Sequence, residues 1–289
     1  MRTYVEALEK EGKVGLVLRG RQPEGTRISV SGVEIGDPGR FIVFAGPCSV
    51  ENREQILGAA QTLKAAGAHV LRGGAYKPTT YPVKFQGLEE EGLILLDEAK
   101  RASGLPVITE VMDPRDVEIV GGHTDIFQIG TRNFQNYDLL NEVGRSQTPV
   151  FLKRGTWGTV DEVLGAAERI LRQGNTQVML CERGIVGGPT YERVFPTIRW
   201  HPDLMIIPAL KTLTHLPVIF DASHATGYRE FVEPMALAAA AAGADGLMVE
   251  VHPEPEKSLT DAPQAIDYKA FGHLIERLRS VLAAVGRTL

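Results

Sequence analysis

Residues 107–129 read Val107-Ile-Thr-Glu-Val-Met-Asp-Pro-Arg-Asp-Val-Glu-Ile-Val-Gly-Gly-His-Thr-Asp-Ile-Phe-Gln-Ile129. Two short runs rich in β-branched residues, 107–110 and 126–129, flank a segment that we expect to be helical over 115–121. The order strand, helix, strand is typical of two parallel strands joined by a helix that covers them. The fold therefore depends on how often this unit recurs along the chain.

The same alternation continues in both directions from this stretch. Helices are expected at 53–66, 88–102, 115–121, 137–143, 160–172, near 204–213, 231–242 and 268–284, and strands at 41–45, 70–73, 107–110, 126–129, 150–153, 178–181, 218–220 and 247–251. Eight strands separated by helices predict a (β/α)₈ or TIM barrel, of the α/β class. A doubly wound open sheet fits less well, because no GxGxxG or Walker-type phosphate loop follows an early strand.

Residues 1–40 precede the first of these units. A short helix over 1–13 and a hairpin over 27–35 are expected there, and residues 41–289 are expected to form the barrel. We expect the extension either to cap the N-terminal mouth of the barrel or to pack in an oligomer interface.

The composition excludes a disordered chain, since 43% of the 289 residues are hydrophobic and 23% are charged. A net charge of −5 gives no general electrostatic reason to expect a nucleic-acid partner. The longest apolar stretch, 235–242, is too short for a membrane span, and residues 1–13 have no signal-peptide core, so a cytoplasmic location is expected. The two cysteines, Cys48 and Cys181, fall at expected strand ends, which argues against a disulfide scaffold.

Charged side chains stand at the expected C-terminal end of almost every strand, where barrel enzymes keep their chemistry. Many are cations, in a protein of net negative charge: Arg72, Lys77, Arg132, Lys153, Arg154 and Arg183. Their mutual repulsion at one barrel mouth is unfavourable unless multiply charged anions bind among them. The pattern favours a phosphate or carboxylate site over the alternative, a solvated rim.

A second group of side chains combines one thiol, one imidazole and two carboxylates, on Cys48, His224, Glu250 and Asp261. They stand at or after the first, seventh and eighth strands, which become neighbours when the barrel closes. Mixed sulfur, nitrogen and oxygen ligands suit a first-row divalent ion and leave room for a substrate oxygen. The alternative stays open, because a buried cysteine usually serves packing and a lone histidine is usually only hydrogen-bonded.

Several motifs occur in the order and at the spacing of one enzyme family. They are Ala45-Gly-Pro-Cys48-Ser, Leu71-Arg-Gly-Gly-Ala-Tyr-Lys77-Pro, Gln128-Ile-Gly-Thr-Arg132-Asn, Leu152-Lys-Arg-Gly155, Leu180-Cys-Glu-Arg-Gly184, Ser223-His-Ala-Thr-Gly227 and Val249-Glu-Val-His-Pro-Glu-Pro-Glu-Lys257. From about residue 32 to residue 278, the sequence therefore resembles the type Iβ family of 3-deoxy-D-arabino-heptulosonate 7-phosphate (DAHP) synthases.

The resemblance implies a homo-oligomer, a dimer or a tetramer, that condenses phosphoenolpyruvate with erythrose 4-phosphate and releases inorganic phosphate. This reaction is the first step of the shikimate pathway to the aromatic amino acids. The resemblance also implies that a divalent ion such as manganese, iron, cobalt or zinc is bound by Cys48, His224, Glu250 and Asp261. For the phosphate and carboxylate of phosphoenolpyruvate it implies a cradle of Arg132, Lys153 and Arg183, with further contacts from Arg72 and Lys77.

The reaction suggests further roles. Phosphoenolpyruvate attacks through C3 while water adds to C2, and a metal ion, here with His224 among its ligands, polarises the aldehyde oxygen. The proton on the nascent alkoxide could be handled by Lys77, which the resemblance places near the aldehyde, or by Asp221, and the water could be oriented by Glu110 or Glu182. Structural salt bridges are the alternative for these last residues.

Two segments depart from the family, and both concern the aldehyde. The family motif Lys-Pro-Arg-Thr/Ser reads Lys77-Pro-Thr-Thr80, so Thr79 replaces the arginine expected to grip the phosphate of erythrose 4-phosphate. Candidates for this end of the substrate are Thr79, Thr80 and Lys84. Lys84 is either the replacement cation or a solvated loop charge.

The second departure follows Arg183-Gly184, where the family continues Ile-Arg-Thr-Phe-Glu. Here the chain reads Ile185-Val-Gly-Gly-Pro-Thr-Tyr-Glu-Arg193 and is several residues longer before Pro217. A longer loop at this place could reshape the aldehyde pocket. Its candidate lining residues are Tyr191, Arg193, Arg199 and His201.

Three functions remain to be distinguished. The first is a DAHP synthase with a rearranged phosphate grip, and the second is a related phosphoenolpyruvate aldol synthase with another aldehyde acceptor. Among such relatives, a 3-deoxy-manno-octulosonate 8-phosphate synthase fits less well, because Lys77-Pro78 and Cys48 match the heptulosonate pattern better. The third is a catalytically silent binding or regulatory barrel, against which the presence of all four expected metal ligands argues.

Overall fold

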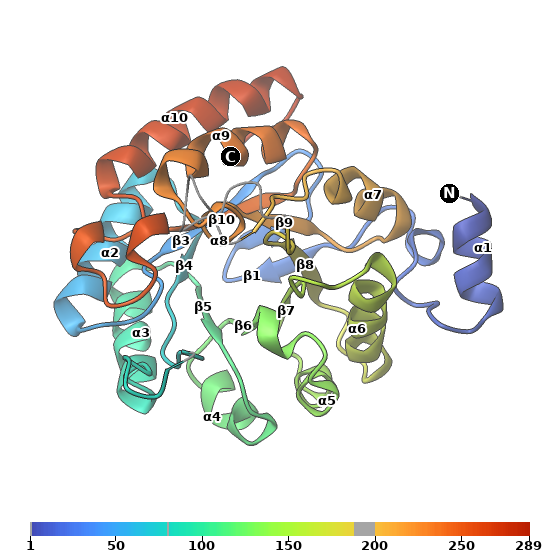
Figure 1. Ribbon diagram of the computed structural model, residues 1–289, viewed down its shortest axis with the longest axis horizontal. Helices are drawn as coiled ribbons and strands as arrows, with labels where there is room; N and C mark the ends of the chain where they lie inside the picture. The colour runs from blue at the N-terminus through green and yellow to red at the C-terminus, as the bar shows by residue number, and fades with distance from the viewer. Residues whose placement is uncertain (1, 80, 188–199) are drawn as a thin grey trace.

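The computed structural model describes residues 2–79, 81–187 and 200–289. In these residues eight parallel strands close a barrel in the order β10-β3-β4-β5-β6-β7-β8-β9 (Figure 1). The strands are β3 (Ile42–Gly46), β4 (Val70–Arg72), β5 (Val107–Glu110), β6 (Ile126–Ile129), β7 (Val150–Lys153), β8 (Val178–Glu182), β9 (Val218–Asp221) and β10 (Gly246–Glu250). The predicted (β/α)₈ barrel is confirmed, and each strand lies where the sequence places it.

Helices surround the strands (Figure 1). They are α2 (Arg53–Ala66), α3 (Glu90–Ser103), α4 (Val117–Gly121), α5 (Tyr137–Arg145), α6 (Val160–Arg172), α7 (Ile206–Leu213), α8 (Ala222–Thr226), α9 (Arg229–Ala241) and α10 (Tyr268–Ala284). The sequence does not predict α8, because so short a helix shows no helical period. It begins where the Asp221 side chain accepts the N–H of His224, and it ends at Gly227 with φ 66°. No described helix combines the length and apolar character of a membrane span.

Two layers of apolar side chains follow from the alternation of residues along the strands. Outward-facing residues such as Val43, Leu71 and Val107 belong to an outer core between strands and helices. The inward-facing residues form an inner core, which contains Ile42, Phe44, Val70, Ile108, Ile126, Phe151, Met179, Cys181, Ile219 and Met248. Because both faces are buried, the apolar residues of each strand follow one another directly, and polar residues gather toward the C-terminal end of the strand.

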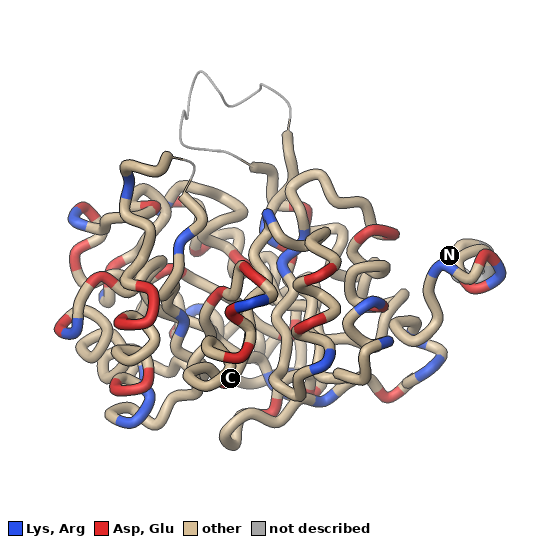
Figure 2. The backbone as a smooth tube through the Cα atoms, turned by 90° about the horizontal axis from the view of Figure 1, so that it is seen from below, with Lys and Arg blue, Asp and Glu red and all other residues tan. Residues whose placement is uncertain are grey.

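The N-terminal extension packs against the barrel along much of its length. The hairpin of β1 (Ile28–Val30) and β2 (Val33–Ile35) adds Ile28, Val30 and Ile35 to the inner core, so its apolar face covers the N-terminal end of the barrel. Upstream, the amides of Gly15 and Val17 donate to Oε2 of Glu168 on α6, at 3.1 and 3.0 Å. Helix α1 (Arg2–Lys10) lies at the edge of the molecule (Figure 2), but its Leu8 is buried in the outer core and its Tyr4 hydroxyl donates to Asp161 of α6. The division of the chain at residue 40 stays a prediction.

Candidate active site

A layer of polar side chains lies directly beyond the inner core, at the C-terminal end of the barrel. Side chains two residues apart on a strand point to the same side. A residue that stands two positions after an inward-facing core residue therefore also faces the barrel axis. Seven polar residues meet this condition, namely Arg72, Glu110, Gln128, Lys153, Arg183, Asp221 and Glu250. All are buried, with between 0% and 8% of their surface exposed. Because charged groups are rarely buried without a function or a partner, this layer marks the site.

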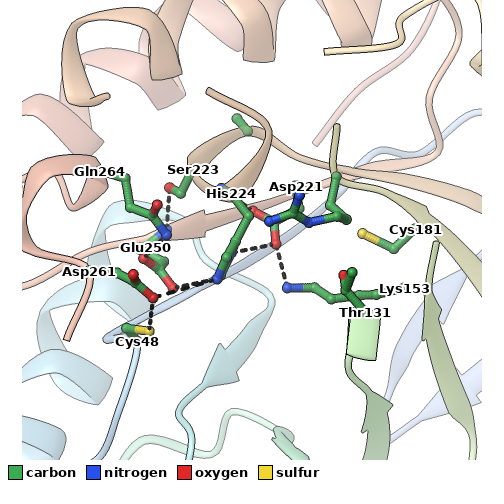
Figure 3. Close-up of polar contacts among 12 residues, drawn as sticks. Cys48, Thr131, Lys153, Cys181, Asp221, Ser223, His224, Glu250, Asp261 and Gln264 are labelled. Atoms are coloured by element: carbon green, nitrogen blue, oxygen red, sulfur yellow. Dashed lines mark hydrogen bonds and ion pairs between the residues drawn. The ribbon is translucent and has the colours of Figure 1, made fainter. Parts of the chain in front are cut away.

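Cys48, His224, Glu250 and Asp261 converge at one side of this layer (Figure 3). Their donor atoms all lie within 4.8 Å of one another. Cys48 Sγ is 3.3 Å from Asp261 Oδ2, and His224 Nε2 is 3.5 Å from Glu250 Oε1. Ligand atoms about 2.0–2.3 Å from one ion lie roughly 3–4.5 Å apart, so both the spacing and the donor set fit a first-row divalent ion. The structure thus brings together all the side chains that the sequence assigns to a metal site.

Cys48 reaches this cluster because β3 ends in a glycine. A Cβ on Gly46 would overlap the carbonyl oxygen of Arg72, so no side chain fits at that position. Burial, followed by the negative charge of Glu250, raises the pKa of the Cys48 thiol to about 12. Lys77 Nζ lies 2.9 Å from the sulfur. A metal ion would therefore have to displace the thiol proton, and the ammonium group is placed to favour the resulting thiolate.

His224 is held in place by Asp221. Oδ2 of Asp221 lies 2.9 Å from Nδ1 of His224, and Oδ1 accepts the backbone N–H of His224 at 3.0 Å. Lys153 Nζ lies 2.5 Å from the same Oδ2. Burial would raise the pKa of Asp221, but His224 and Lys153 outweigh it and hold the pKa well below its usual range. Asp221 therefore stays an anion that accepts the Nδ1 proton, which leaves the lone pair on Nε2 of His224.

A cavity of about 420 Å³ opens above the polar layer. It is bounded on one side by His224 and Asp261 of the metal cluster, and its described cations are Arg72, Lys77, Lys84, Arg132, Lys153 and Arg183. The cations expected at the strand ends thus surround one space, with one exception. Arg154 Nη1 instead pairs with Glu182 Oε2 at 2.9 Å and with Asp203 Oδ2 at 2.7 Å, so it is not among the described residues that line the cavity.

The two candidates for orienting water, Glu110 and Glu182, have different surroundings. Glu182 pairs with Arg154 and accepts the N–H of Gly184 at 2.6 Å, which fixes the backbone beside Arg183. Glu110 lines the cavity, and its Oε2 accepts a hydrogen bond from Gln128 at 3.1 Å. Its Oε1 is buried and has no hydrogen-bond partner among the described residues. The geometry therefore favours Glu110 over Glu182 for contact with a water in the cavity.

The segments that depart from the family are only partly described. Thr79 and Lys84 line the cavity, with Lys84 Nζ 5.7 Å from the centre of the Tyr81 ring. His201 is not among the described lining residues, contrary to expectation, because its backbone pairs with Ile185 and its ring packs closely against Gly187. The other candidates lie outside the described residues, namely Thr80, Tyr191, Arg193 and Arg199.

Both tryptophans of the chain, Trp157 and Trp200, line the cavity, although the sequence gives neither a role. The guanidinium carbon of Arg183 lies 4.9 Å from the centre of the Trp200 ring. The antiparallel pairing of Ile185 with His201 brings Trp200 to this place. Gln128 is another lining residue without a predicted role. The alternation of side chains along a strand could have identified it, because Gln128 stands two positions after the inward-facing Ile126.

Relatives of the chain are found among both sequences and structures. The profile of the DAHP synthetase I family matches residues 20–284. A phospho-2-dehydro-3-deoxyheptonate aldolase of Thermotoga maritima is 45% identical over 94% of this chain and 78% of its own length. A 2-dehydro-3-deoxyphosphooctonate aldolase of Geobacter sulfurreducens is 30% identical over 89% of this chain and 98% of its own length.

Solved structures lead to the same group. The crystal structure of the phospho-2-dehydro-3-deoxyheptonate aldolase (DAHP synthase) from T. maritima gives a TM-score of 0.89 at 44% identity and covers 95% of this chain and 78% of that one. A truncated form of 3-deoxy-D-arabino-heptulosonate 7-phosphate synthase from the same organism gives 0.86 at 41% identity, over 96% and 99% of the two chains. Sequence profile, barrel and polar layer agree, and the chain belongs to the DAHP synthetase I family.

Proposed function

We propose that this chain is a DAHP synthase, which condenses phosphoenolpyruvate with erythrose 4-phosphate and releases inorganic phosphate. The observation that carries the proposal is one cavity in which buried cations lie beside a cluster of metal-binding side chains. Phosphoenolpyruvate carries a phosphate and a carboxylate close together, so it needs several cations in a small space. The similarity to the T. maritima phospho-2-dehydro-3-deoxyheptonate aldolase favours this function over a different aldehyde acceptor, and the complete site argues against a silent barrel.

The cluster of Cys48, His224, Glu250 and Asp261 would hold the divalent ion, for which manganese, iron, cobalt and zinc are all compatible with the donor set. When bound, the ion polarises the aldehyde oxygen. Asp221 keeps His224 in the tautomer whose Nε2 can coordinate. Arg72 and Gln264 hold the two oxygens of Glu250, each at 2.7 Å.

Phosphoenolpyruvate is assigned to the inner cations of the cavity, all of which are buried except Arg132 and Lys77. Arg132 and Arg183 suit its phosphate and carboxylate, because a guanidinium can donate two parallel hydrogen bonds. Lys153 and Arg72 are already paired with Asp221 and Glu250, so they supply positive charge at fixed positions. Lys77 completes this set of cations on the aldehyde side.

Water and proton handling are assigned to Glu110 and Lys77. Oε1 of Glu110 is a buried acceptor on the cavity wall, which suits a residue that orients the water adding to C2. Burial would lower the pKa of Lys77, but Cys48 and Asp261 outweigh it and raise the pKa. Lys77 therefore stays protonated and can donate to the nascent alkoxide. Asp221 is tied to His224 and Lys153, which supports an orienting role rather than proton transfer.

The phosphate of erythrose 4-phosphate is assigned to Thr79, Thr80 and Lys84. A lysine and hydroxyl groups keep one positive charge but lose the bidentate geometry of the family's arginine. Loss of one charge-assisted contact costs about 1.5–3 kcal/mol, or roughly tenfold to hundredfold in affinity. The departure from the family thus predicts a lower affinity for erythrose 4-phosphate rather than a different reaction.

An aldehyde panel scored by phosphate release from phosphoenolpyruvate tests the proposal. Metal-dependent release should be much faster with erythrose 4-phosphate than with unphosphorylated erythrose or arabinose 5-phosphate. Turnover with erythrose 4-phosphate no better than with erythrose would contradict it. Because both tryptophans line the cavity, a change in intrinsic fluorescence should report phosphoenolpyruvate binding even without turnover.

The Lys84→Ala variant isolates the aldehyde end of the site. We expect it to raise KM for erythrose 4-phosphate about tenfold and to leave KM for phosphoenolpyruvate unchanged, because one charge-assisted contact is lost. Lys64→Ala, on the exposed face of α2, is the matched control and should change neither constant. An unchanged KM for erythrose 4-phosphate in Lys84→Ala would make Lys84 a solvated loop charge.

We further propose that the enzyme is a cytoplasmic homo-oligomer, a dimer or a tetramer. Tyr4 and Leu16 of the N-terminal extension are 38% and 44% exposed, and such apolar side chains outside the barrel are available for contact with a second copy. Light scattering at micromolar concentration tests the assembly, and a monomer would reject it.

A further inference from the structure

We propose that Glu51 is a positioning residue that fixes the loop carrying Asp261 and thereby sets the affinity of the cluster for its metal ion. This role rests on the metal site proposed above. Glu250 ends β10, and Cys48 and His224 follow the ends of β3 and β9 closely, whereas Asp261 comes from an irregular segment well beyond β10. A ligand on such a segment needs contacts that hold the segment against the barrel.

The Glu51 carboxylate contacts that segment at three points. Its Oε1 accepts the N–H of Leu259 at 2.8 Å and lies 3.4 Å from Ser258 Oγ. Its Oε2 lies 3.3 Å from Nε2 of His252. The side chains of Glu51 and His252 are only 9% and 6% exposed. A carboxylate this buried is costly to leave without donors, so these contacts tie the two segments together.

His252 is fixed as a donor to Glu51. Its Nδ1 accepts the backbone N–H of Glu254 at 3.0 Å. A neutral imidazole whose Nδ1 is an acceptor carries its proton on Nε2, and Nε2 is the atom that faces Glu51. The carboxylate therefore receives an amide and an imidazole donor from the segment that leads to Asp261, while the hydroxyl of Ser258 lies close to it and donates to Thr260 O at 2.7 Å.

The backbone at Asp261 explains why an anchor is needed. Asp261 has φ 52° and ψ 31°, a left-handed conformation that L-residues other than glycine adopt at a cost. Ser49 Oγ, 2.5 Å from Thr260 Oγ1, provides a second tie directly beside it. Ser49 and Glu51 follow Cys48 in the chain, so one segment positions both the thiol and the carboxylate that meet at 3.3 Å.

The test measures Co²⁺ binding to the metal-free protein through the thiolate-to-metal absorption band, which reports ligation by Cys48, together with thermal unfolding. Glu51→Ala should weaken Co²⁺ binding about 10- to 100-fold, as loss of an outer-shell partner does. Glu51→Gln should weaken it less, because the amide oxygen still accepts the N–H of Leu259 while its NH₂ group opposes the donor on His252.

Glu168→Gln is the matched control. Glu168 is also a buried carboxylate, 4% exposed, that accepts two backbone amides, but it is not among the described residues that line the cavity. The Glu168→Gln variant should have a lower unfolding temperature and an unchanged affinity for Co²⁺. Ser49→Ala removes only the hydrogen bond to Thr260 and should weaken Co²⁺ binding severalfold. If Glu51→Ala does not fold, Ser49→Ala and Glu51→Gln still test the inference.

Three results would overturn the inference. Wild-type Co²⁺ affinity in folded Glu51 and Ser49 variants would show that the loop needs no anchor. An equal loss of affinity in Glu168→Gln would show that any loss of stability weakens the site. Absence of Co²⁺ binding by the wild-type protein would instead overturn the metal site itself, and with it the proposed function.

Discussion

The guanidinium of Arg72 lies 2.7 Å from Oε1 of Glu250, and the two side chains are 4% and 0% exposed. Glu250 belongs to the metal cluster, whereas Arg72 lines the cavity assigned to phosphoenolpyruvate. The pair therefore joins the two halves of the site. Loss of either partner leaves a buried charge without its counter-ion.

Glu250→Ala is expected to lower the free energy of unfolding of the metal-free protein by about 3–5 kcal/mol, because Arg72 is left buried and unpaired. The double variant Arg72→Met with Glu250→Leu should recover most of this loss, since both charges are replaced by apolar groups. Urea unfolding of the three proteins measures the effect. A single variant as stable as the wild type would show that the pair does not hold the layer together.

Gly130→Ala probes the assigned role of Glu110. A Cβ at Gly130 would overlap Oε1 of Glu110, while φ −68° and ψ 159° suit alanine, so the variant acts first on the carboxylate of Glu110. We expect kcat to fall on the order of 100-fold, the contribution of a general acid or base. In Gly165→Ala on α6 the new Cβ meets nothing within 4 Å, so this control should keep kcat and gain up to about 1 kcal/mol of stability. An unchanged kcat in Gly130→Ala would contradict the assignment.

Trp200→Leu should raise KM for phosphoenolpyruvate severalfold, because Arg183 loses an aromatic face whose contact contributes roughly 0.5–2 kcal/mol. Trp200→Phe keeps a ring and should restore most of the affinity, with kcat less affected in both. Steady-state kinetics in phosphoenolpyruvate distinguish the two. Trp157→Phe, on another part of the cavity wall, is the control, and equal defects in Trp200→Phe and Trp200→Leu would count against stacking.

His69 should make the fold sensitive to acid. Its Nδ1 accepts the N–H of Val43 at 3.0 Å, which requires an unprotonated ring. Burial, followed by the charges of Arg40 and Lys64, lowers its pKa from 6.5 to about 4. Between these values the unfolded chain binds a proton that the folded protein excludes, so the stability from this group is complete above pH 6.5 and is lost as the pH falls through 4.

Urea unfolding at several pH values checks this dependence. Stability should fall by at most about 1.4 kcal/mol per pH unit in that window on account of His69. His69→Asn keeps an acceptor for Val43 without a titrating ring, so its stability should depend less on pH. A variant with the wild-type slope would exclude His69 as the source.

The barrel could be predicted because short apolar runs alternate with helices along the chain. The convergence of Cys48, His224, Glu250 and Asp261 could also be predicted, because closure brings the first, seventh and eighth strands together. Lys153 and Arg154 show where residue type alone misleads. Both are strand-end cations, but only Lys153 follows an inward-facing residue at the strand period, and Arg154 pairs with Glu182 instead. Strand alternation could have separated them.

Contacts between distant segments could not be predicted in the same way. Trp200 reaches Arg183 through the pairing of Ile185 with His201, which no local pattern encodes. The tie between Glu51 and Leu259 depends likewise on how two irregular segments pack. Helix α8 could have been predicted from its capping residues, because an aspartate precedes it and a glycine follows it.

The hairpin of β1 and β2 fills the N-terminal end of the barrel with Ile28, Val30 and Ile35. Reactants and products must then use the same opening, at the opposite end. Lys153 and Arg183, which are assigned to phosphoenolpyruvate, are buried at the floor of this opening, whereas Lys84, which is assigned to the sugar phosphate, is exposed at its margin. With the two substrates assigned in this way, a molecule held at the floor has to enter before one held at the margin, and we expect phosphoenolpyruvate to bind before the sugar.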